Sequence, residues 1–238
     1  MDGRIMTKQS RVLPMVEIFQ TVEGEGLKAG FPTTFVRLYN CNLRCKWCDT
    51  TYSYAPHQPE FYATIEEIVE QVVQLENPSI CLTGGEPLMH GDKSAALIQA
   101  LAEQPVIEEI HIETNGAIDL TPFCALRATN TDVREKVRFI MDVKLRSSGE
   151  KEAMVWENFP LLSGQDEIKF VIGDEREFKE AVEVIESYYE QGQLLFSPVW
   201  EQLAPAALVE MILASPYKRA KLSLQTHKYI WHPEQKGV

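Results

Sequence analysis

Short apolar segments of the kind that form buried strands alternate with helix-type segments along most of this 238-residue chain. The strand-type segments are residues 33–39, 79–83, 108–116, 137–144, 166–172, 194–200 and 220–229. The helix-type segments are residues 64–76, 93–103, 174 to about 190, and 205–213. This alternation predicts an α/β fold with a parallel sheet and crossover helices. Polar residues and glycines gather after the strands, where parallel sheets place their functional sites.

Composition gives no sign of a second domain. Hydrophobic residues make up 45% of the chain and charged residues 24%, as in an ordinary globular protein. No repeat, low-complexity tract or linker divides the sequence, so we expect one domain over residues 1–238. Residues 145–165 lack a regular pattern, and we interpret them as an irregular loop that is able to move.

The charge balance narrows the class of partner. Lys and Arg number 23 while Asp and Glu number 35, so the formal net charge is −12. This sign disfavours a nucleic-acid-binding surface, but it leaves room for a small anionic substrate held by one or two cationic side chains. No apolar run approaches the roughly 20 residues that span a bilayer, and residues 1–15 lack the apolar core of a signal peptide. We therefore expect a cytoplasmic protein with no membrane partner.

Three cysteines lie within eight residues, in the stretch CNLRCKWC, with the spacing C-x3-C-x2-C. They are Cys41, Cys45 and Cys48. Clustered cysteines in a reducing compartment indicate metal binding rather than disulfides. Thiolates suit iron–sulfur clusters, and a four-iron cube with three thiolate ligands keeps one iron open. An amine and a carboxylate, such as the methionine end of S-adenosylmethionine (SAM), can occupy that iron.

A structural zinc site is the alternative for the same cysteines. Such a site is usually closed by four ligands, and the nearby candidate for the fourth is His57, which lies in a Pro-flanked segment of surface character. The remaining cysteines, Cys81 and Cys124, lie in apolar segments and are interpreted as small core residues. Under this alternative the chain is a zinc-stabilised interaction module without catalysis.

A second motif follows the strand at residues 79–83. That strand runs into GGEP, residues 84–87, about 35 residues beyond the cysteines. Together, the cysteine spacing and this strand end resemble the radical SAM family. The resemblance implies a partial (β/α) TIM-like barrel of about six parallel strands. It also implies a [4Fe-4S] cluster on the three cysteines as the catalytic group, with SAM as a further cofactor on the open iron.

The same resemblance implies SAM contacts at the ends of several strands. In IMDVK, Asp142 and Lys144 lie two residues apart and match an Asp-x-Lys pattern that related enzymes use to contact SAM. An exposed ion pair is the simpler alternative for these two residues. The full set of expected SAM-binding residues is Trp47, Cys48, Asp49, Gly85, Glu86, Asn115, Asp142 and Lys144.

The two ends of the chain narrow the family further. Residues 17–26 read EIFQTVEGEG and residues 223–229 read SLQTHKY, and a general radical SAM core needs neither. With FVRLYNCNLRCKWCDT, they resemble the 7-carboxy-7-deazaguanine synthases from about Val16 to Ile230. The resemblance implies a ring contraction of 6-carboxy-5,6,7,8-tetrahydropterin to 7-carboxy-7-deazaguanine with loss of ammonia, in queuosine and 7-deazapurine biosynthesis.

This resemblance also implies a substrate site with capping segments at about residues 15–30 and 220–238. Carboxylates suit the N–H-rich edge of a pterin, and an arginine suits its carboxylate. The expected substrate-binding residues are Val22, Glu23, Gly24, Glu25, Arg37, Thr83, Gln225 and His227. Without the resemblance, pairing with a surface acid accounts for Arg37, and an ordinary core position accounts for His227.

Further partners follow from the resemblance. Thr50 corresponds to a magnesium (Mg2+) ligand, and turn capping is the simpler alternative. A flavodoxin- or ferredoxin-type protein is the expected electron donor, and the chain is expected to be a homodimer. A glycyl-radical-activating enzyme is the competing enzymatic hypothesis, because such enzymes share the three cysteines and the Asp-x-Lys strand. The VEGEG stretch at residues 22–26 favours a small substrate over a docked protein.

Overall fold

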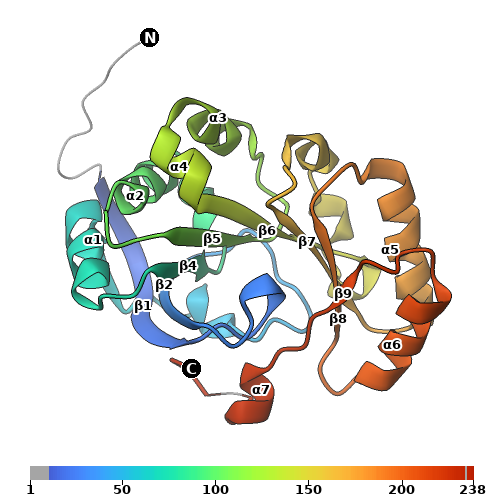
Figure 1. Cartoon of the computed structure of the whole chain (residues 1–238). Coiled ribbons are helices and arrows are strands. Elements are labelled where there is room, and N and C mark those ends of the chain that lie inside the picture. Colours follow the sequence, from blue (N-terminus) through green and yellow to red (C-terminus); the bar gives the residue numbers. More distant parts are fainter. Residues whose placement is uncertain (1–10, 234) are drawn as a thin grey trace.

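The computed structural model describes residues 11–233 and 235–238, and the strands in this part of the chain form one sheet (Figure 1). The strands are β1 (Val12–Val22), β2 (Pro32–Leu38), β3 (Phe61–Thr64), β4 (Ser79–Gly84), β5 (Glu109–Thr114), β6 (Val137–Val143), β7 (Glu167–Ile172), β8 (Gln193–Pro198) and β9 (Lys221–Leu222). Their order in the sheet is β3-β1-β2-β4-β5-β6-β7-β8-β9. From β2 to β9 the neighbours in that order pair in parallel, which confirms the predicted parallel sheet and partial barrel.

The sheet has an antiparallel edge that the sequence pattern did not predict. β1 pairs with β2 and β3 in the antiparallel direction. Its register shifts between Met15 and Glu17, and its second half is only partly buried. A bulge and a half-exposed end weaken the period-two pattern by which a strand is recognised. The strand nevertheless matters for the site, because it leads into the VEGEG turn, residues 22–26, which lies beside the amino end of β2 and lines the pocket described below.

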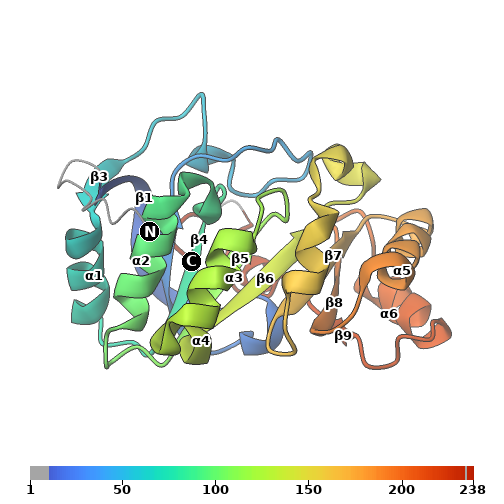
Figure 2. The same ribbon diagram turned by 90° about the horizontal axis from the view of Figure 1, so that it is seen from above.

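Helices cover the outer side of the curved sheet, as Figures 1 and 2 show. They are α1 (Ile65–Gln74), α2 (Asp92–Ala102), α3 (Thr121–Thr129), α4 (Thr131–Lys136), α5 (Glu175–Tyr188) and α6 (Pro205–Ala214), with a last short helix, α7 (His227–Ile230), near the C-terminal end. α1 begins with a capping box formed by Thr64 and Glu67. Asp174 caps α5 by accepting from the backbone N–H of Glu177 at 2.8 Å. Leu, Ile and Phe side chains fill the space between helices and sheet, and each fully buried one stabilises the fold by about 1.5–3 kcal/mol.

Residues 145–165 are irregular, as expected, but they are packed into the structure. They form three 3-10 turns, η5 (Arg146–Ser148), η6 (Lys151–Ala153) and η7 (Trp156–Leu161). Phe159 is buried, and the buried Asn158 amide donates to the carbonyls of Gly116 and Ile118 at 3.2 and 2.8 Å. The Asn158 side-chain oxygen accepts from the N–H of Leu120 at 2.9 Å. This segment therefore has the buried contacts of a fixed element, contrary to the interpretation as a loop able to move.

The predicted strand at residues 220–229 is mostly wrong. Only Lys221 and Leu222 pair with β8, and the chain then turns into α7. The reason is a competing partner, because the backbone N–H and the hydroxyl of Thr226 both donate to the carbonyl of Gly24 at 2.9 Å. These bonds draw the C-terminal segment to the VEGEG turn instead of along the sheet.

Within the described residues, no helix is long and apolar enough to cross a membrane. The expected absence of a signal-peptide core concerns residues 1–15, of which residues 1–10 lie outside the described part of the chain.

Candidate active site

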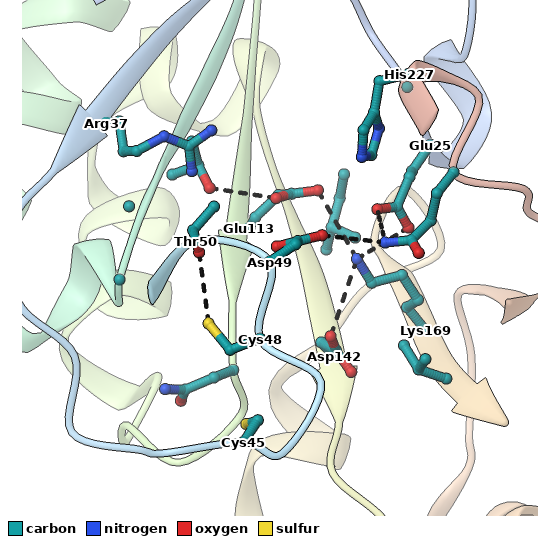
Figure 3. A pocket seen from close by; sticks show the side chains of 18 of the residues that line it. Glu25, Arg37, Cys45, Cys48, Asp49, Thr50, Glu113, Asp142, Lys169 and His227 are labelled. Carbon is teal, nitrogen blue, oxygen red and sulfur yellow. Dashed lines mark hydrogen bonds and ion pairs between the residues drawn. The ribbon is translucent and has the colours of Figure 1, made fainter. Parts of the chain in front are cut away.

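A pocket is lined by residues of β2 and β4 to β7, by the cysteine segment that follows β2, by the VEGEG turn and by the C-terminal segment (Figure 3). The structure brings together there nearly all of the residues predicted from the sequence. Those that line it are Val22, Glu23, Gly24, Glu25, Arg37, Cys41, Cys45, Trp47, Cys48, Asp49, Thr50, Thr83, Gly85, Asn115, Asp142, Lys144, Gln225 and His227. Glu86 does not line the pocket, and neither does the exposed His57, which the zinc alternative requires.

Backbone hydrogen bonds shape the cysteine loop, residues 40–50. Asn40 begins it with a φ of 91°, in the left-handed region that asparagine tolerates better than most residues. Its N–H donates to the carbonyl of Ser53 at 2.7 Å, and its carbonyl accepts from the N–H of Glu86 at 2.8 Å. Farther along, the N–H of Lys46 donates to the carbonyl of Ser148 at 3.0 Å. The loop is therefore tied to the segment after β4 and to the turn after β6.

The glycine pair after β4 is required by the close approach of two chain segments. A Cβ on Gly84 would lie 2.3 Å from the carbonyl oxygen of Leu38, and one on Gly85 would lie 2.2 Å from that of Asn40. Both distances are far below a normal contact, so only glycine allows the end of β4 to pack beside the entry to the cysteine loop. Gly85, which the resemblance implies as a SAM contact, therefore also accommodates the chain's own backbone.

The three thiols form a donor set that fits an iron–sulfur cluster. All are free and line one pocket, and the Sγ of Cys41 accepts from the N–H of Leu43 at 3.4 Å. Burial raises the pKa of Cys45 to about 11, and the nearby Lys144 ammonium opposes that rise. Burial also raises the pKa of Cys41. Protein groups alone thus leave two of the thiols protonated at neutral pH, whereas a bound metal cation deprotonates a coordinating thiol outright.

Asp142 and Lys144 form an ion pair inside the pocket rather than on the surface. Lys144 Nζ lies 2.8 Å from Asp142 Oδ2, and the two side chains are 11% and 17% exposed. The other carboxylate oxygen, Asp142 Oδ1, is buried and has no hydrogen-bond partner among the described residues. Asn115 lines the same pocket, where its amide donates to Asn42 at 2.8 Å and lies 3.8 Å from the Sγ of Cys41. A buried, unpaired carboxylate oxygen near the thiols fits a ligand that carries an ammonium group.

Glu86 corrects the sequence-based set of SAM residues. Its side chain is fully buried, and its carboxylate accepts from the N–H of Leu88 at 3.0 Å, the N–H of Asn115 at 2.7 Å and the hydroxyl of Thr114 at 3.0 Å. Burial raises the pKa of Glu86 to about 7, although these bonds oppose the rise. The side chain ties the segment after β4 to the end of β5, so its role is structural and not a contact with SAM.

Both glutamates of the VEGEG turn line the pocket, but protein groups bind both carboxylate oxygens of Glu23. Glu23 is buried, accepts from the N–H of Gly24 at 2.9 Å, and lies 2.5 Å from His111 Nε2. Gly24 makes room for His227, because a Cβ there would lie 2.4 Å from the Nδ1 of that histidine. Glu25 reaches the amide of Gln225 at 3.2 Å. Glu23, which was expected to bind the substrate, therefore has its carboxylate bound by protein groups. Glu25 is the carboxylate that remains in the pocket.

Lys169 is the main site residue that the sequence-based reasoning missed. Its Nζ lies 3.3 Å from Glu25, 3.9 Å from Glu113 and 3.9 Å from Asp142, each on a different element (Figure 3). The side chain is 9% exposed, and these three carboxylates raise its pKa well above the usual value despite its burial. Burial raises the pKa of Glu113, and Lys169 opposes that rise. A lysine within the apolar strand EIKFVI was the available signal.

Arg37 extends into the pocket from β2 (Figure 3). Its Nε donates to Glu17 at 2.8 Å, and the guanidinium lies 5.9 Å from the ring centre of Tyr52. No hydrogen bond to its two terminal nitrogens is made by residues 11–233 or 235–238, so both are free to receive an anion. Thr83, on the neighbouring strand, donates to Glu113 at 3.2 Å.

The remaining predicted residues lie at the rim. Thr50 Oγ1 is 3.7 Å from Cys48 Sγ. Partial burial acts to raise the pKa of Asp49, but the nearby Lys228 and His227 outweigh this effect, so its pKa is lowered. The Lys228 ammonium lies 3.4 Å from the Asp49 carboxylate. The pocket lining also extends past the region of resemblance, to Pro233, Gln235 and Val238.

Comparisons with known proteins agree with this geometry. A sequence model of the radical SAM superfamily matches residues 36–197. The 7-carboxy-7-deazaguanine synthase of Clostridium acetobutylicum is 31% identical over 226 residues, covering 94% of this chain and 98% of that protein. The protein of the same name from Leptospira interrogans is 34% identical over 241 residues, covering 93% of this chain and 96% of that protein.

Solved structures show the same fold. The crystal structure of QueE from Escherichia coli has a TM-score of 0.67 at 21% identity, covering 91% of this chain and 95% of that chain. SuiB from Streptococcus suis bound to S-adenosylmethionine has a TM-score of 0.52 at 15% identity, covering 78% of this chain and 47% of that chain.

Proposed function

We propose, since this chain belongs to the 7-carboxy-7-deazaguanine synthase family of the radical SAM superfamily, that its pocket converts 6-carboxy-5,6,7,8-tetrahydropterin to 7-carboxy-7-deazaguanine with loss of ammonia. The observation that carries the proposal is one pocket with two chemically different halves. Three thiols and the Asp142–Lys144 pair line one half. Arg37, Glu25 and Lys169 line the other.

The first half suits the cofactors. When bound, a reduced [4Fe-4S] cluster supplies the electron that cleaves SAM, and the cleavage supplies the radical that takes hydrogen from the substrate. Cys41, Cys45 and Cys48 would hold the cluster. The unpaired Asp142 Oδ1 would accept from the amino group of SAM, and Lys144 would keep the other oxygen of that carboxylate engaged. Trp47, Asp49, Gly85 and Asn115 are the remaining proposed contacts.

The second half suits a small anion with an N–H-rich edge. The two terminal nitrogens of Arg37 match a substrate carboxylate, because a guanidinium binds a carboxylate with two parallel hydrogen bonds. Glu25 and the backbone of Val22 and Gly24 would read the N–H-rich edge of the pterin, with Thr83, Gln225 and His227 around it. Glu23 supports this turn rather than contacting the ring.

We propose that Glu113 acts as a proton donor in this half of the pocket. Its burial favours the protonated carboxyl, while Lys169 favours the carboxylate, so the two forms are balanced more closely than in water. Loss of ammonia requires a proton on the departing nitrogen, and a buried carboxyl is a suitable donor. The neighbouring Thr83 hydroxyl, 3.2 Å away, would orient the Glu113 carboxyl.

The other partners of the family are proposals for this chain. Thr50 offers a hard oxygen beside the cysteines, which suits Mg2+ that also keeps water and substrate oxygens. We propose a single radical SAM domain whose segments at residues 15–30 and 220–238 cap the substrate. An external flavodoxin- or ferredoxin-type donor and a homodimeric assembly complete the proposal. A glycyl-radical-activating enzyme needs a protein substrate, and the enclosed Arg37 and Glu25 favour a small one.

An anaerobic reaction tests the proposal. Purified protein with reconstituted iron and sulfide is mixed with a chemical reductant, SAM and the carboxypterin, and the products are followed by mass spectrometry. We expect a brown protein with about four irons per chain and a product with the mass of 7-carboxy-7-deazaguanine. A brown protein that cleaves SAM but leaves the carboxypterin unchanged would contradict the substrate. A colourless protein with one zinc would contradict the enzyme class.

A further inference from the structure

Charged side chains form a buried layer beneath the pocket, in the barrel interior where other parallel barrels place apolar residues. The buried charge layer consists of Glu23, Glu109, His111, Arg138 and Glu167. His111 and Glu167 are fully buried, Glu23 is 3% exposed and Arg138 is 9% exposed, while the Glu109 side chain, at the edge of the layer, is 22% exposed. Burial of so many ionisable groups is costly unless each is paired, so the layer calls for a functional explanation.

Contacts within the layer run in an unbroken path across three strands. His111 Nε2 lies 2.5 Å from Glu23, and His111 Nδ1 lies 3.7 Å from Glu109. Arg138 continues the path, with 3.0 Å between Nη2 and Glu109 and 3.4 Å between Nε and Glu167. Lys28 joins the path at its middle, with Nζ 2.5 Å from the second oxygen of Glu109.

Both ends of this path hold the VEGEG turn and the residues after it. At one end, Glu23 Oε1 accepts from the N–H of Gly24 at 2.9 Å and from that of Glu25 at 3.3 Å. At the other, Glu167 Oε2 accepts from the N–H of Leu27 at 2.9 Å. The layer therefore fixes the backbone on both sides of Glu25, the carboxylate that remains in the pocket.

His111 is the group on which the charge balance of the layer depends. The layer has three negative charges, on its three glutamates. Arg138 and Lys28 neutralise two of them, and His111 neutralises the third only if its imidazole carries a proton on each nitrogen. Burial opposes that state, but two neighbouring carboxylates outweigh it and raise the pKa of His111 to about 9: Glu109, which lies 3.7 Å from Nδ1, and Glu23, which accepts a hydrogen bond from Nε2. Arg138 on β6 opposes the rise, and the thiol of Cys81 faces the ring from β4.

A metal site is the competing explanation for Glu23, Cys81 and His111, whose donor atoms lie within 4.8 Å of one another. A metal would need the ring nitrogen and the carboxylate oxygen that already bond each other at 2.5 Å. It would also add positive charge to a layer that balances without it. The contacts therefore favour an internal support over a ligand site.

We propose that His111 is a positioning residue for substrate binding, acting through Glu23 to hold the VEGEG turn in the shape that aims Glu25 into the pocket. This inference rests on the proposed function for the identity of the ligand, but not for the mechanical role. His111 touches neither the pocket nor the cysteine loop, so its effect should reach the substrate half and leave the cofactor half unchanged.

The test compares His111→Gln with His57→Gln, which makes the same change at an exposed position. Glutamine retains one hydrogen bond to Glu23 but carries no charge. In the reconstituted protein we expect His111→Gln to weaken carboxypterin binding by roughly tenfold to a hundredfold, the range for loss of one charge-assisted hydrogen bond. Iron content and SAM binding should match those of His57→Gln. Unchanged carboxypterin binding in His111→Gln would overturn the proposal.

The pH dependence separates positioning from general destabilisation. In the parent protein, carboxypterin affinity should fall as the pH rises through about 9, where His111 loses its second proton. In His111→Gln the affinity should be low and flat over the same range. A parallel fall in both proteins would assign the titration to another group and would count against His111.

Hydrogen–deuterium exchange tests whether His111 holds the VEGEG turn, and it does so even if the carboxypterin is not the substrate. We expect His111→Gln to accelerate exchange at the N–H groups of Gly24 and Glu25 at least fivefold, while the N–H groups of the cysteine loop exchange as in the parent. If His111→Gln proves too unstable, Glu109→Gln removes the partner of Nδ1 from a less buried position and should accelerate exchange of the same groups by a smaller factor. Unchanged exchange at Gly24 and Glu25 in the folded variant would overturn the proposal whatever the substrate is.

Discussion

The cysteine loop and the VEGEG turn meet in one pocket, yet they are held in opposite ways. Backbone hydrogen bonds hold most of the cysteine loop, with added bonds from the side chains of Glu150 and Asn115, and its residues Asn42, Arg44 and Lys46 are exposed. Buried charged side chains from β5, β6 and β7 hold the VEGEG turn, together with the C-terminal segment. The chemistry of the loop is therefore contained in one short stretch of sequence. The geometry of the turn depends on residues that lie 88 to 202 positions away in the sequence.

This contrast predicts that substitutions in the loop remove the cofactor, while substitutions in the support of the turn weaken only substrate binding. The largest effect is expected for the cysteines themselves. Replacing Cys41, Cys45 or Cys48 by Ala leaves two anchors for a four-iron cube, so each variant should lose its cluster and all turnover. Iron analysis and visible absorbance measure this result. Cys124→Ala is the matched control and should retain the cluster, whereas normal SAM cleavage by Cys45→Ala would contradict the ligand assignment.

Removal of Lys169 should have the next largest effect, and it should act on stability. Lys169→Met leaves Glu25, Glu113 and Asp142 without their shared cation, and breaking a buried ion pair from one side typically costs about 3–5 kcal/mol. Urea denaturation of the cluster-free protein measures the free energy of unfolding. Lys179→Met, at a 68% exposed position paired with Glu175, should cost less than about 1 kcal/mol. Equal losses of unfolding free energy in the two variants would contradict the assignment of Lys169 as the shared cation of the three carboxylates.

The buried charge layer should also give the protein an alkaline limit of stability. The folded-state pKa of His111, about 9, lies above its ordinary value of 6.5, so its contribution to stability is complete below pH 6.5 and is lost as the pH rises through 9. Glu109 works in the opposite sense, because its pKa of about 2 makes its contribution disappear as the pH falls from 4.5 through 2. The unfolding free energy of the parent should decline between pH 7 and 9. A decline of the same size in His111→Gln would refute this assignment.

The smallest effect is expected for Thr50, at the edge of the cysteine loop. Thr50→Val keeps the shape of the side chain and removes its oxygen. Cluster content should be unchanged because Thr50 Oγ1 only approaches the Cys48 sulfur at 3.7 Å. Stimulation of turnover by Mg2+ should weaken several-fold, as a titration with Mg2+ would measure. A variant that responds to Mg2+ as the parent does would remove Thr50 from the metal site.

The same contrast explains how far the sequence predicts the structure. The longer helices, the parallel strands and the cysteine spacing are recognised from residues a few positions apart, and their patterns were sufficient. Lys169 and His111 were missed because each lies in a short apolar strand, and its partners reach it only through the fold. A lone lysine or histidine in such a strand carries no local sign of those partners.

Glu86 and the segment 220–229 were mispredicted for a related reason. Glu86 belongs to the GGEP motif and was therefore expected in the pocket, but its carboxylate accepts hydrogen bonds from the N–H groups of Leu88 and Asn115 instead. The C-terminal segment has strand-like composition, yet Thr226 finds its partner at Gly24. In both cases a tertiary hydrogen bond overrides a local pattern.

One titration tests most directly the central claim that the two halves of the pocket serve different ligands. Binding of SAM and of the carboxypterin is measured on the same preparations of parent, Arg37→Lys and Arg37→Ala. Arg37→Ala should bind the carboxypterin roughly tenfold to a hundredfold more weakly, as expected for a lost charge-assisted hydrogen bond. Arg37→Lys should fall between the two, because it keeps the charge but loses the two-point contact. SAM affinity and iron content should remain at the parent values. Equal carboxypterin affinity in parent and Arg37→Ala, with the cluster intact, would contradict both the role of Arg37 and the division of the pocket.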